Sequence, residues 1–257
     1  SIADGISNVY VAGYTGRGNI AIPGMPFGIM EGSTISRDYG SLDGLDVTQV
    51  HSDDRLNYTP FLDANGGYTY LGTGMIGDPQ PDFVYGVTNT LSYKWATIRV
   101  QFDHQVGGDM FTTTVSTMTG RGILGNTGFD RFVPVITSGL KLDGTPYTKQ
   151  TTANQHYWPN TGVFYDEQSV YDASTMRLRE VSLSLVAPKS FLNGTPFGNA
   201  SLTLSAQNIW HLAYNTPKDS NFDPEVSSYG TGNNVRGFDE MTGPTAKKYG
   251  ATLSLTF

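Results

Sequence analysis

The last nine residues of the sequence read Tyr249-Gly-Ala-Thr-Leu-Ser-Leu-Thr-Phe257. Apolar side chains alternate here with glycine, threonine and serine. A period of two predicts a β-strand with one apolar face and one small, polar face. Two settings suit such a strand: a soluble sheet packed on a core, or a membrane barrel whose outer face meets lipid.

Composition narrows the classes of protein to which the chain can belong. The chain has 257 residues, enough for one large all-β domain or two small ones. It contains no cysteine, which excludes disulfides and cysteine-based metal sites. The formal net charge of −7 argues against a nucleic-acid partner, because nucleic-acid binders carry a basic face. No segment approaches the ~18 apolar residues that predict a membrane helix.

Further segments alternate in the same way, at about the 9–11 residues of a tilted membrane strand. With the terminal strand and two earlier segments they predict roughly six or seven strands. The segments before the terminal strand are Ile6–Tyr14, Met25–Ile35, Phe83–Tyr93, Ile98–Gln105, Val181–Ala187 and Leu202–Gln207.

The connections between these segments differ greatly in length. Tyr93 to Ala96 and Pro188 to Gly198 are short. The long connections, rich in Gly, Asn, Asp, Pro and Thr, are Tyr39 to Pro81, Gly107 to Ala173 and His211 to Thr245. Alternation of short and long connections is typical of outer-membrane barrels, whose periplasmic turns are short and extracellular loops long. A β-sandwich has no reason to alternate so regularly.

Four segments, in this order, resemble the SusC/RagA family of TonB-dependent outer-membrane transporters. They are Gly24-Met-Pro-Phe-Gly-Ile-Met-Glu-Gly32; Ile76–Gly86 followed by Asn89 and Leu91-Ser-Tyr-Lys94; Met176–Leu185 closed by Pro188; and Ala206-Gln-Asn-Ile209, Asp223-Pro-Glu225 and the terminal strand. The resemblance covers most of the chain from Gly24 onward.

The resemblance implies that residues 1–257 are the carboxyl-terminal part of an antiparallel transmembrane β-barrel of about 22 strands with long extracellular loops. It implies import of a glycan or peptide across the outer membrane of a Gram-negative, Bacteroidetes-like bacterium. The partners implied are a SusD-like surface lipoprotein, the lipid bilayer and the remainder of the same transporter. That remainder would supply the plug and the contact with the TonB complex.

The barrel interpretation assigns roles to the two faces. Polar side chains would line the lumen: Arg99, Gln101, Asp103, Gln105 and Gln207. The apolar residues Tyr249, Leu253, Leu255 and Phe257 would form the terminal signal read during barrel assembly, as the resemblance implies.

Two loop segments are candidates for contact with ligand or lipoprotein. The first places His156, Tyr157 and Trp158 side by side, with Tyr165 following, and aromatic faces suit sugar rings or peptide side chains. The alternative is that these rings pack within their own loop. The second segment contains Asn221, Asp223 and Glu225, whose carboxylates could instead anchor the loop. A calcium site including Asp219 is a further alternative, although the 12-residue calcium-loop pattern is missing.

The sequence predicts neither a catalytic group nor a cofactor. There is no G-x-S-x-G motif. The histidines at 51, 104, 156 and 211 lack metal-ligand spacing. Two other classes of function stay open: a passive outer-membrane porin or surface structural protein, and a soluble carbohydrate-binding β-sandwich.

Overall fold

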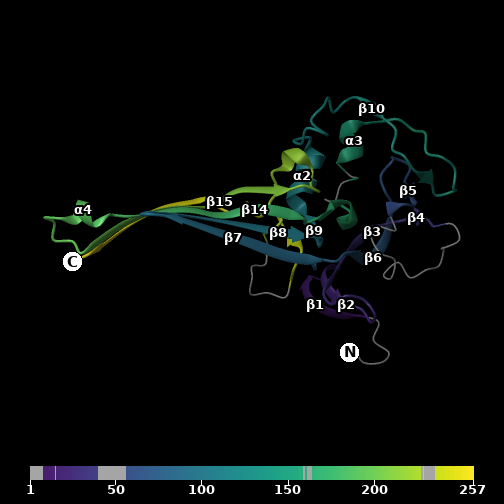
Figure 1. The fold of residues 1–257 in the computed structure, drawn as a ribbon. Coiled ribbons are helices and arrows are strands. Elements are labelled where there is room, and N and C mark those ends of the chain that lie inside the picture. Colours follow the sequence, from purple (N-terminus) through teal and green to yellow (C-terminus); the bar gives the residue numbers. More distant parts are fainter. Residues whose placement is uncertain are drawn as a thin grey trace.

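The computed structural model describes residues 8–14, 16–39, 56–158, 160, 164–226, 228 and 235–257. A thin, long sheet projects from a compact end (Figure 1). His51 and the start of the predicted Ile6–Tyr14 strand lie outside the described residues. Among the described residues, no helix has the length and apolar character needed to span a membrane.

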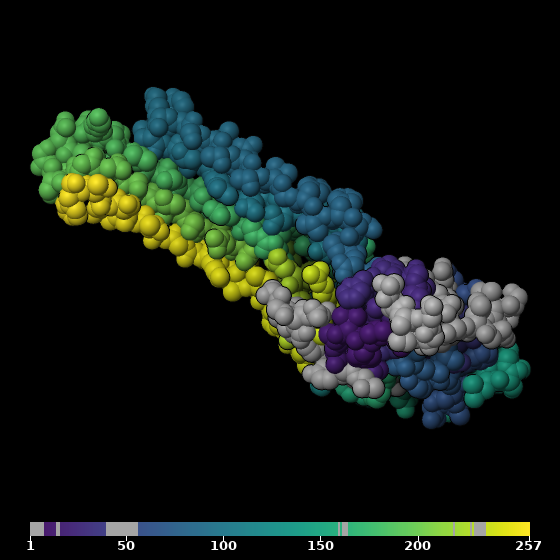
Figure 2. Space-filling model, turned by 90° about the horizontal axis from the view of Figure 1, so that it is seen from below, coloured from purple at the N-terminus to yellow at the C-terminus, as the bar shows by residue number. Residues whose placement is uncertain are grey.

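Five antiparallel strands form the long sheet, in the order β17-β15-β14-β8-β7. Their bounds are β7 Phe83–Tyr93, β8 Ala96–Val106, β14 Thr175–Val186, β15 Asn199–Ala213 and β17 Lys248–Thr256. β7 and the terminal strand β17 are the two edges, visible on opposite sides of the slab in Figure 2.

The register confirms the predicted faces. One row across the sheet joins Leu91, Ile98, Leu183, Leu204 and Ala251, all apolar. The adjacent row is polar or small and joins Thr90, Arg99, Ser182, Ser205 and Gly250. Because alternate residues of a strand point to opposite faces, one face of the sheet is mainly apolar, with Asn89 and His104 as exceptions, and the other is mainly polar.

The apolar face is uncovered. Leu91 is 69% exposed and Leu253 is 65% exposed, where the core of a sandwich would bury both. Among the described residues, the second packed layer that a soluble β-sandwich needs is not present. An apolar face open to the surroundings is the arrangement of a transmembrane barrel wall.

Both predicted short turns lie at one end of the long sheet, together with the carboxyl terminus (Figure 1). Lys94 and Trp95 join β7 to β8, and Lys94 has a left-handed φ of 52°. The β14–β15 turn contains the short helix α4, Lys189–Leu192. The long connections leave from the opposite end, as predicted.

The compact end holds a second sheet of four strands, in the order β1-β2-β3-β6. Their bounds are β1 Val9–Tyr14, β2 Arg17–Ala21, β3 Ile29–Ile35 and β6 Tyr70–Gly77. β3 carries the predicted Met25–Ile35 strand, but it is buried on both faces and pairs with β6. The long sheet therefore has five strands instead of six or seven, because the two earliest predicted strands pack in this second sheet.

The expected loops contain regular structure of their own. The helices are α2 Thr113–Arg121 and α3 Ala153–Tyr157, and the 3₁₀ turns are η2 Asp166–Ser169 and η3 Lys218–Ser220. The short strands within them are β5 Thr59–Leu62, β9 Asp109–Thr112, β10 Pro134–Val135, β11 Leu140–Lys141, β12 Thr151–Thr152, β13 Val170–Asp172 and β16 Phe238–Asp239. Strand β4, Arg37–Asp38, lies just before the first loop.

Local chemistry explains helix α2. The Thr112 hydroxyl accepts a hydrogen bond from the Val115 N–H at the helix start, and Gly122 ends the helix at a φ of 70°.

A small apolar core anchors the compact end; its buried residues are Met30, Ile76, Phe111, Val235 and Phe238. Segments from four distant parts of the chain thus meet at the mouth of the sheet.

Candidate functional site

An irregularity in the long sheet creates the site. The outward-facing pairs Val100–Val181 and Phe102–Leu178 fix the register on either side of it. One residue separates Val100 from Phe102 on β8, whereas two separate Val181 from Leu178 on β14. On β15 the corresponding residues, Ala206 and Trp210, are separated by three residues. This β-bulge shifts the alternation of β14 and places Arg177 opposite the inward-facing Asp103.

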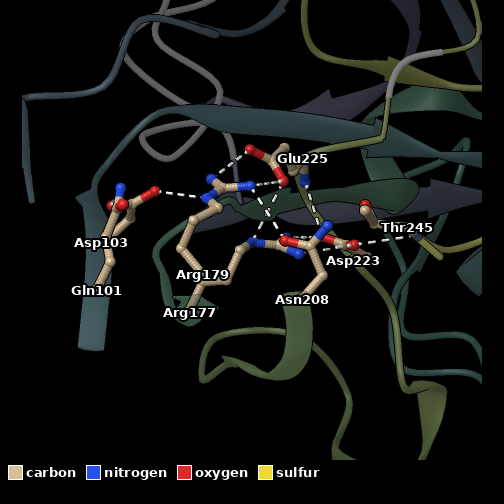
Figure 3. Close-up of polar contacts among 8 residues, drawn as sticks. All are labelled: Gln101, Asp103, Arg177, Arg179, Asn208, Asp223, Glu225 and Thr245. Carbon is tan, nitrogen blue, oxygen red and sulfur yellow. Dashed lines mark hydrogen bonds and ion pairs between the residues drawn. The ribbon is translucent and has the colours of Figure 1, made fainter. Parts of the chain in front are cut away.

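Arg179, the bulged residue, joins strand and loop. Its Nε lies 2.6 Å from Asp103 Oδ2 on β8. Its two terminal nitrogens lie 2.9 and 2.6 Å from the two carboxylate oxygens of Glu225 (Figure 3). This is a bidentate arginine–carboxylate pair, the geometry that gives such contacts their directionality.

Arg177 forms the buried half of the cluster. Its side chain is 2% exposed and that of Asp223 is 0% exposed. Both terminal nitrogens of Arg177 bind the Asp223 carboxylate, and its Nε lies 3.3 Å from Glu225 Oε2. The backbone N–H groups of Thr245 and Glu225 also donate to Asp223, at 3.2 and 3.1 Å. A buried charge pair with this many hydrogen bonds is well compensated.

These contacts determine the ionisation of Asp223. Burial alone would raise the pKa of this carboxyl group. Hydrogen bonds from Arg177 and Thr245, together with the charge of Arg177, outweigh burial and lower the pKa to about 2. Asp223 is therefore an anion at any physiological pH.

The cluster fixes the β15–β17 loop against the polar face of β14. The anchoring role considered for Asp223 and Glu225 is thus confirmed, and their roles as ligand or lipoprotein contacts stay predictions. Asn221 is exposed beside them, with a left-handed φ of 45°. Asp219 accepts a hydrogen bond from the Gly125 N–H at 3.1 Å. In the described part of the chain, no three His, Asp or Glu residues lie close enough together to hold a metal ion.

The predicted polar residues share the face that carries this cluster. The register puts Gln101, Glu180 and Gln207 in one row. Gln101 Nε2 donates to Asp103 Oδ1 at 3.2 Å, and Gln105 Nε2 donates to the Gly107 carbonyl at 3.3 Å. The residues that line this single polar surface are Arg99, Gln101, Asp103, Gln105 and Gln207. Their position in a lumen follows if the sheet closes into a barrel.

The terminal residues occupy the other face. Tyr249, Leu253 and Leu255 pair with the outward-facing Ala206, Leu202 and Ala200 of β15. The Phe257 ring packs on Phe197 in the β14–β15 turn, with centroids 5.2 Å apart. Their function as an assembly signal stays a prediction.

Most of the aromatic segment packs within the compact end. His156 Nδ1 lies 2.9 Å from the Thr137 hydroxyl, and burial lowers the pKa of this histidine. The Tyr157 ring meets Phe129 edge-on and lies 5.1 Å from the Arg131 guanidinium. These contacts match the self-packing alternative for both residues.

Tyr165 and Trp158 have different surroundings. The Tyr165 hydroxyl donates to the Tyr68 carbonyl, and the two rings meet edge-on. Trp158 is 37% exposed and lies 5.5 Å from the Arg121 guanidinium. It lines a cavity of about 500 Å³ with Asp63, Asn65, Gly67, Lys149, Gln150, Thr151, Asn154 and Gln155. Of the predicted aromatic residues, Trp158 is the one placed at a ligand-sized cavity, whose lining residues are mainly polar.

The sequence reasoning missed Arg177 and Arg179, the partners that give Asp223 and Glu225 their role. The available signal was a change in parity. Odd-numbered residues from 181 to 185 are apolar, whereas Arg177 and Arg179 are odd-numbered and charged. Such a change within one strand indicates a bulge.

Comparison with known proteins agrees with this architecture. No family profile matches the chain. TonB-dependent receptors P3 and P26 of Formosa agariphila are 28% and 26% identical to it over 202 and 200 residues, which are 76% and 71% of this chain. The structure of the RagAB peptide transporter matches the whole chain with a TM-score of 0.56 at 20% identity. The RagAB peptide importer in its open-open state matches equally well, at 19% identity.

The chain resembles the SusC/RagA-type TonB-dependent transporters. The relationship indicated by the four sequence segments is confirmed, and the fold is the barrel portion of such a transporter. The chain spans 18% of the length of the two curated relatives and 25% of the RagAB chain it matches. Five strands form an open sheet, so the barrel is not closed within the described residues.

Proposed function

We propose that residues 1–257 are the carboxyl-terminal part of a longer TonB-dependent transporter that imports a nutrient across the outer membrane. The observation that carries this proposal is the long two-faced sheet, in a chain that matches, over all of its own residues, 25% of a chain of the RagAB peptide transporter. The chain would contribute barrel wall and outer loops. Its polar face would line the lumen, and its apolar face would meet lipid.

The placement of the turns supports a direction for the sheet. Outer-membrane barrels have short turns on the periplasmic side. The turns at Lys94–Trp95 and around α4 would then be periplasmic, together with Phe257. The compact end would be extracellular, and the ion-pair cluster would lie where the lumen opens into it.

We further propose that the compact end meets a SusD-like lipoprotein and the transported glycan or peptide. Support comes from the Trp158 cavity, whose volume of about 500 Å³ falls in the ~300–1,000 Å³ range of ligand pockets. Its lining combines amides, one acidic and one basic side chain and an indole ring. That combination suits either sugar hydroxyls or a peptide backbone.

The test uses the full-length transporter expressed in its bacterium. Replacing Trp158 with alanine is expected to weaken uptake of labelled oligosaccharides or peptides, or affinity for the lipoprotein, without changing barrel yield. Trp210→Ala is the matched control, because Trp210 lies on the outward face of β15 in register with Leu178. Uptake and lipoprotein binding that are unchanged in Trp158→Ala would contradict the ligand role. Uptake that persists without TonB would instead support the passive porin.

A further inference from the structure

A groove runs along the apolar face at the turn end of the long sheet. Its volume is about 640 Å³, within the ~300–1,000 Å³ range of small-molecule sites. The walls are formed mainly by outward-facing residues of β14, β15 and β17 and by the two turns, with Val186 and Ser201 of the other face at the strand ends. The lining residues are Trp95, Leu185, Val186, Ala187, Pro188, Phe191, Ala200, Ser201, Leu202 and Leu253.

Closure of a barrel would leave this groove open. Missing strands pair with the edges of a sheet, here β7 and β17, and add no layer over its outer face. The groove opens on the face that meets lipid, so its occupant must come from the membrane side. An unfilled groove would forfeit dispersion contacts along its walls.

The charges beside the groove identify the occupant more closely. Lys94 directly precedes Trp95, and its Nζ lies 5.2 Å from the centre of the Tyr93 ring. Lys189 directly follows Pro188 and begins α4. Residues 93–96 and 187–198, all described, contain these two lysines and no aspartate or glutamate. Cations placed at the edge of an apolar membrane surface favour a lipid phosphate.

We propose that this groove binds a glycerophospholipid from the membrane leaflet at the turn end of the barrel. One acyl chain fills the groove, and Lys94 and Lys189 hold the phosphate. Trp95 and Phe191 lie at the boundary between acyl chain and headgroup, where aromatic side chains are enriched. The inference rests on the barrel fold and is independent of the transported substrate.

The experiment is native mass spectrometry of the full-length transporter in detergent with added phosphatidylglycerol. The wild-type protein is expected to retain lipid that Ala200→Trp loses, because the larger ring fills the groove. Ala251→Trp is the matched control: Ala251 also faces outward, opposite Leu204, but lies outside the groove. Removing both lysines should weaken retention up to about thirtyfold, since each basic residue near an anionic lipid contributes about 1 kcal/mol. Lys141→Ala, in β11 at the compact end and outside the Trp158 cavity, is the control for charge.

Equal lipid retention by wild type, Ala200→Trp and the double lysine variant would overturn the proposal. So would a change of oligomeric state in Ala200→Trp alone, which would show that a second protein copy covers the groove. Uptake assays on the same variants separate this inference from the proposed function, because a groove variant that loses lipid still has an intact lumen.

Discussion

Among single residues, the buried ion pair of Arg177 and Asp223 makes the central contact between β14 and the β15–β17 loop. The pair is stabilising only while all of its hydrogen bonds are made, because the Asp223 carboxylate accepts from one guanidinium and from two backbone N–H groups. Removing one partner of a buried ion pair leaves the other charge uncompensated.

Asp223→Asn should therefore detach the β15–β17 loop, with a destabilisation of about 3–5 kcal/mol. Hydrogen exchange of the backbone N–H groups of Thr245 and Glu225 would report the loss of protection. Asp219→Asn is the control, since Asp219 makes an exposed hydrogen bond to Gly125. Equal protection in wild type and Asp223→Asn would show that the pair does not hold the loop.

The same carboxylate predicts an acid limit for the loop. The pKa of Asp223 falls from the ordinary 3.8 to about 2 in the folded protein. A group with a lowered pKa contributes stability above its unfolded value and loses that contribution as pH falls through the folded value. Loop protection should thus be constant above about pH 5 and decline between about pH 4 and 2. The Asp223→Asn variant, already detached, should show no such decline from this group.

The two faces of the sheet predict unequal responses to charge. Leu204→Arg, on the apolar face, should cost about 2–4 kcal/mol if the residue lies near the bilayer midplane. Thr203→Arg, its neighbour on the polar face, should cost far less. Unfolding of both full-length variants in lipid vesicles measures the difference, and equal costs would contradict a membrane-facing apolar surface.

At the scale of elements, the turns and loops divide cleanly between the two ends of the sheet. Protease added to intact cells should cut only within the long connections at the compact end. Lys94 and Asn193, in the two short turns, should be protected until the outer membrane is opened. Cleavage at either residue in intact cells would reverse the proposed direction of the sheet.

Alternation alone predicted the faces of the long strands, except in the half of β14 beyond the bulge, because residues of a strand alternate between apolar and polar wherever its two faces meet different surroundings. The tight Lys94–Trp95 turn could also be predicted from the sequence. Strand β6 could not, because it lies in a glycine-rich stretch that forms a strand only by pairing with β3. The partners of Asp223 and Glu225 were also beyond local reasoning, because Arg177 and Arg179 are 46 residues away along the chain.

At the scale of the whole molecule, five strands cannot form a closed wall. An open sheet in lipid would leave unpaired backbone groups along both edges, at several kcal/mol per group. β7 should accordingly pair with a strand that precedes this chain in a longer polypeptide, and β17 with the first strand of the barrel.

Intact-mass measurement of the native, denatured complex tests this arrangement. We expect either a polypeptide much longer than 257 residues or a second β-rich chain of complementary size. A closed barrel composed only of a 27.9 kDa species would refute it.

The bulge at Arg179 also limits how this wall can change over evolutionary time. Loss of that single residue would restore a regular zigzag to β14 and leave Arg177 opposite Asp103, because the residues on either side of the bulge already pair in order with β8. Loss of two neighbouring residues at the bulge would instead turn Arg177 outward, away from Asp103 and into hydrocarbon. Deletions at this point of the strand should therefore survive as single residues, at the cost of the Arg179 contacts with Asp103 and Glu225, whereas deletions of two should not.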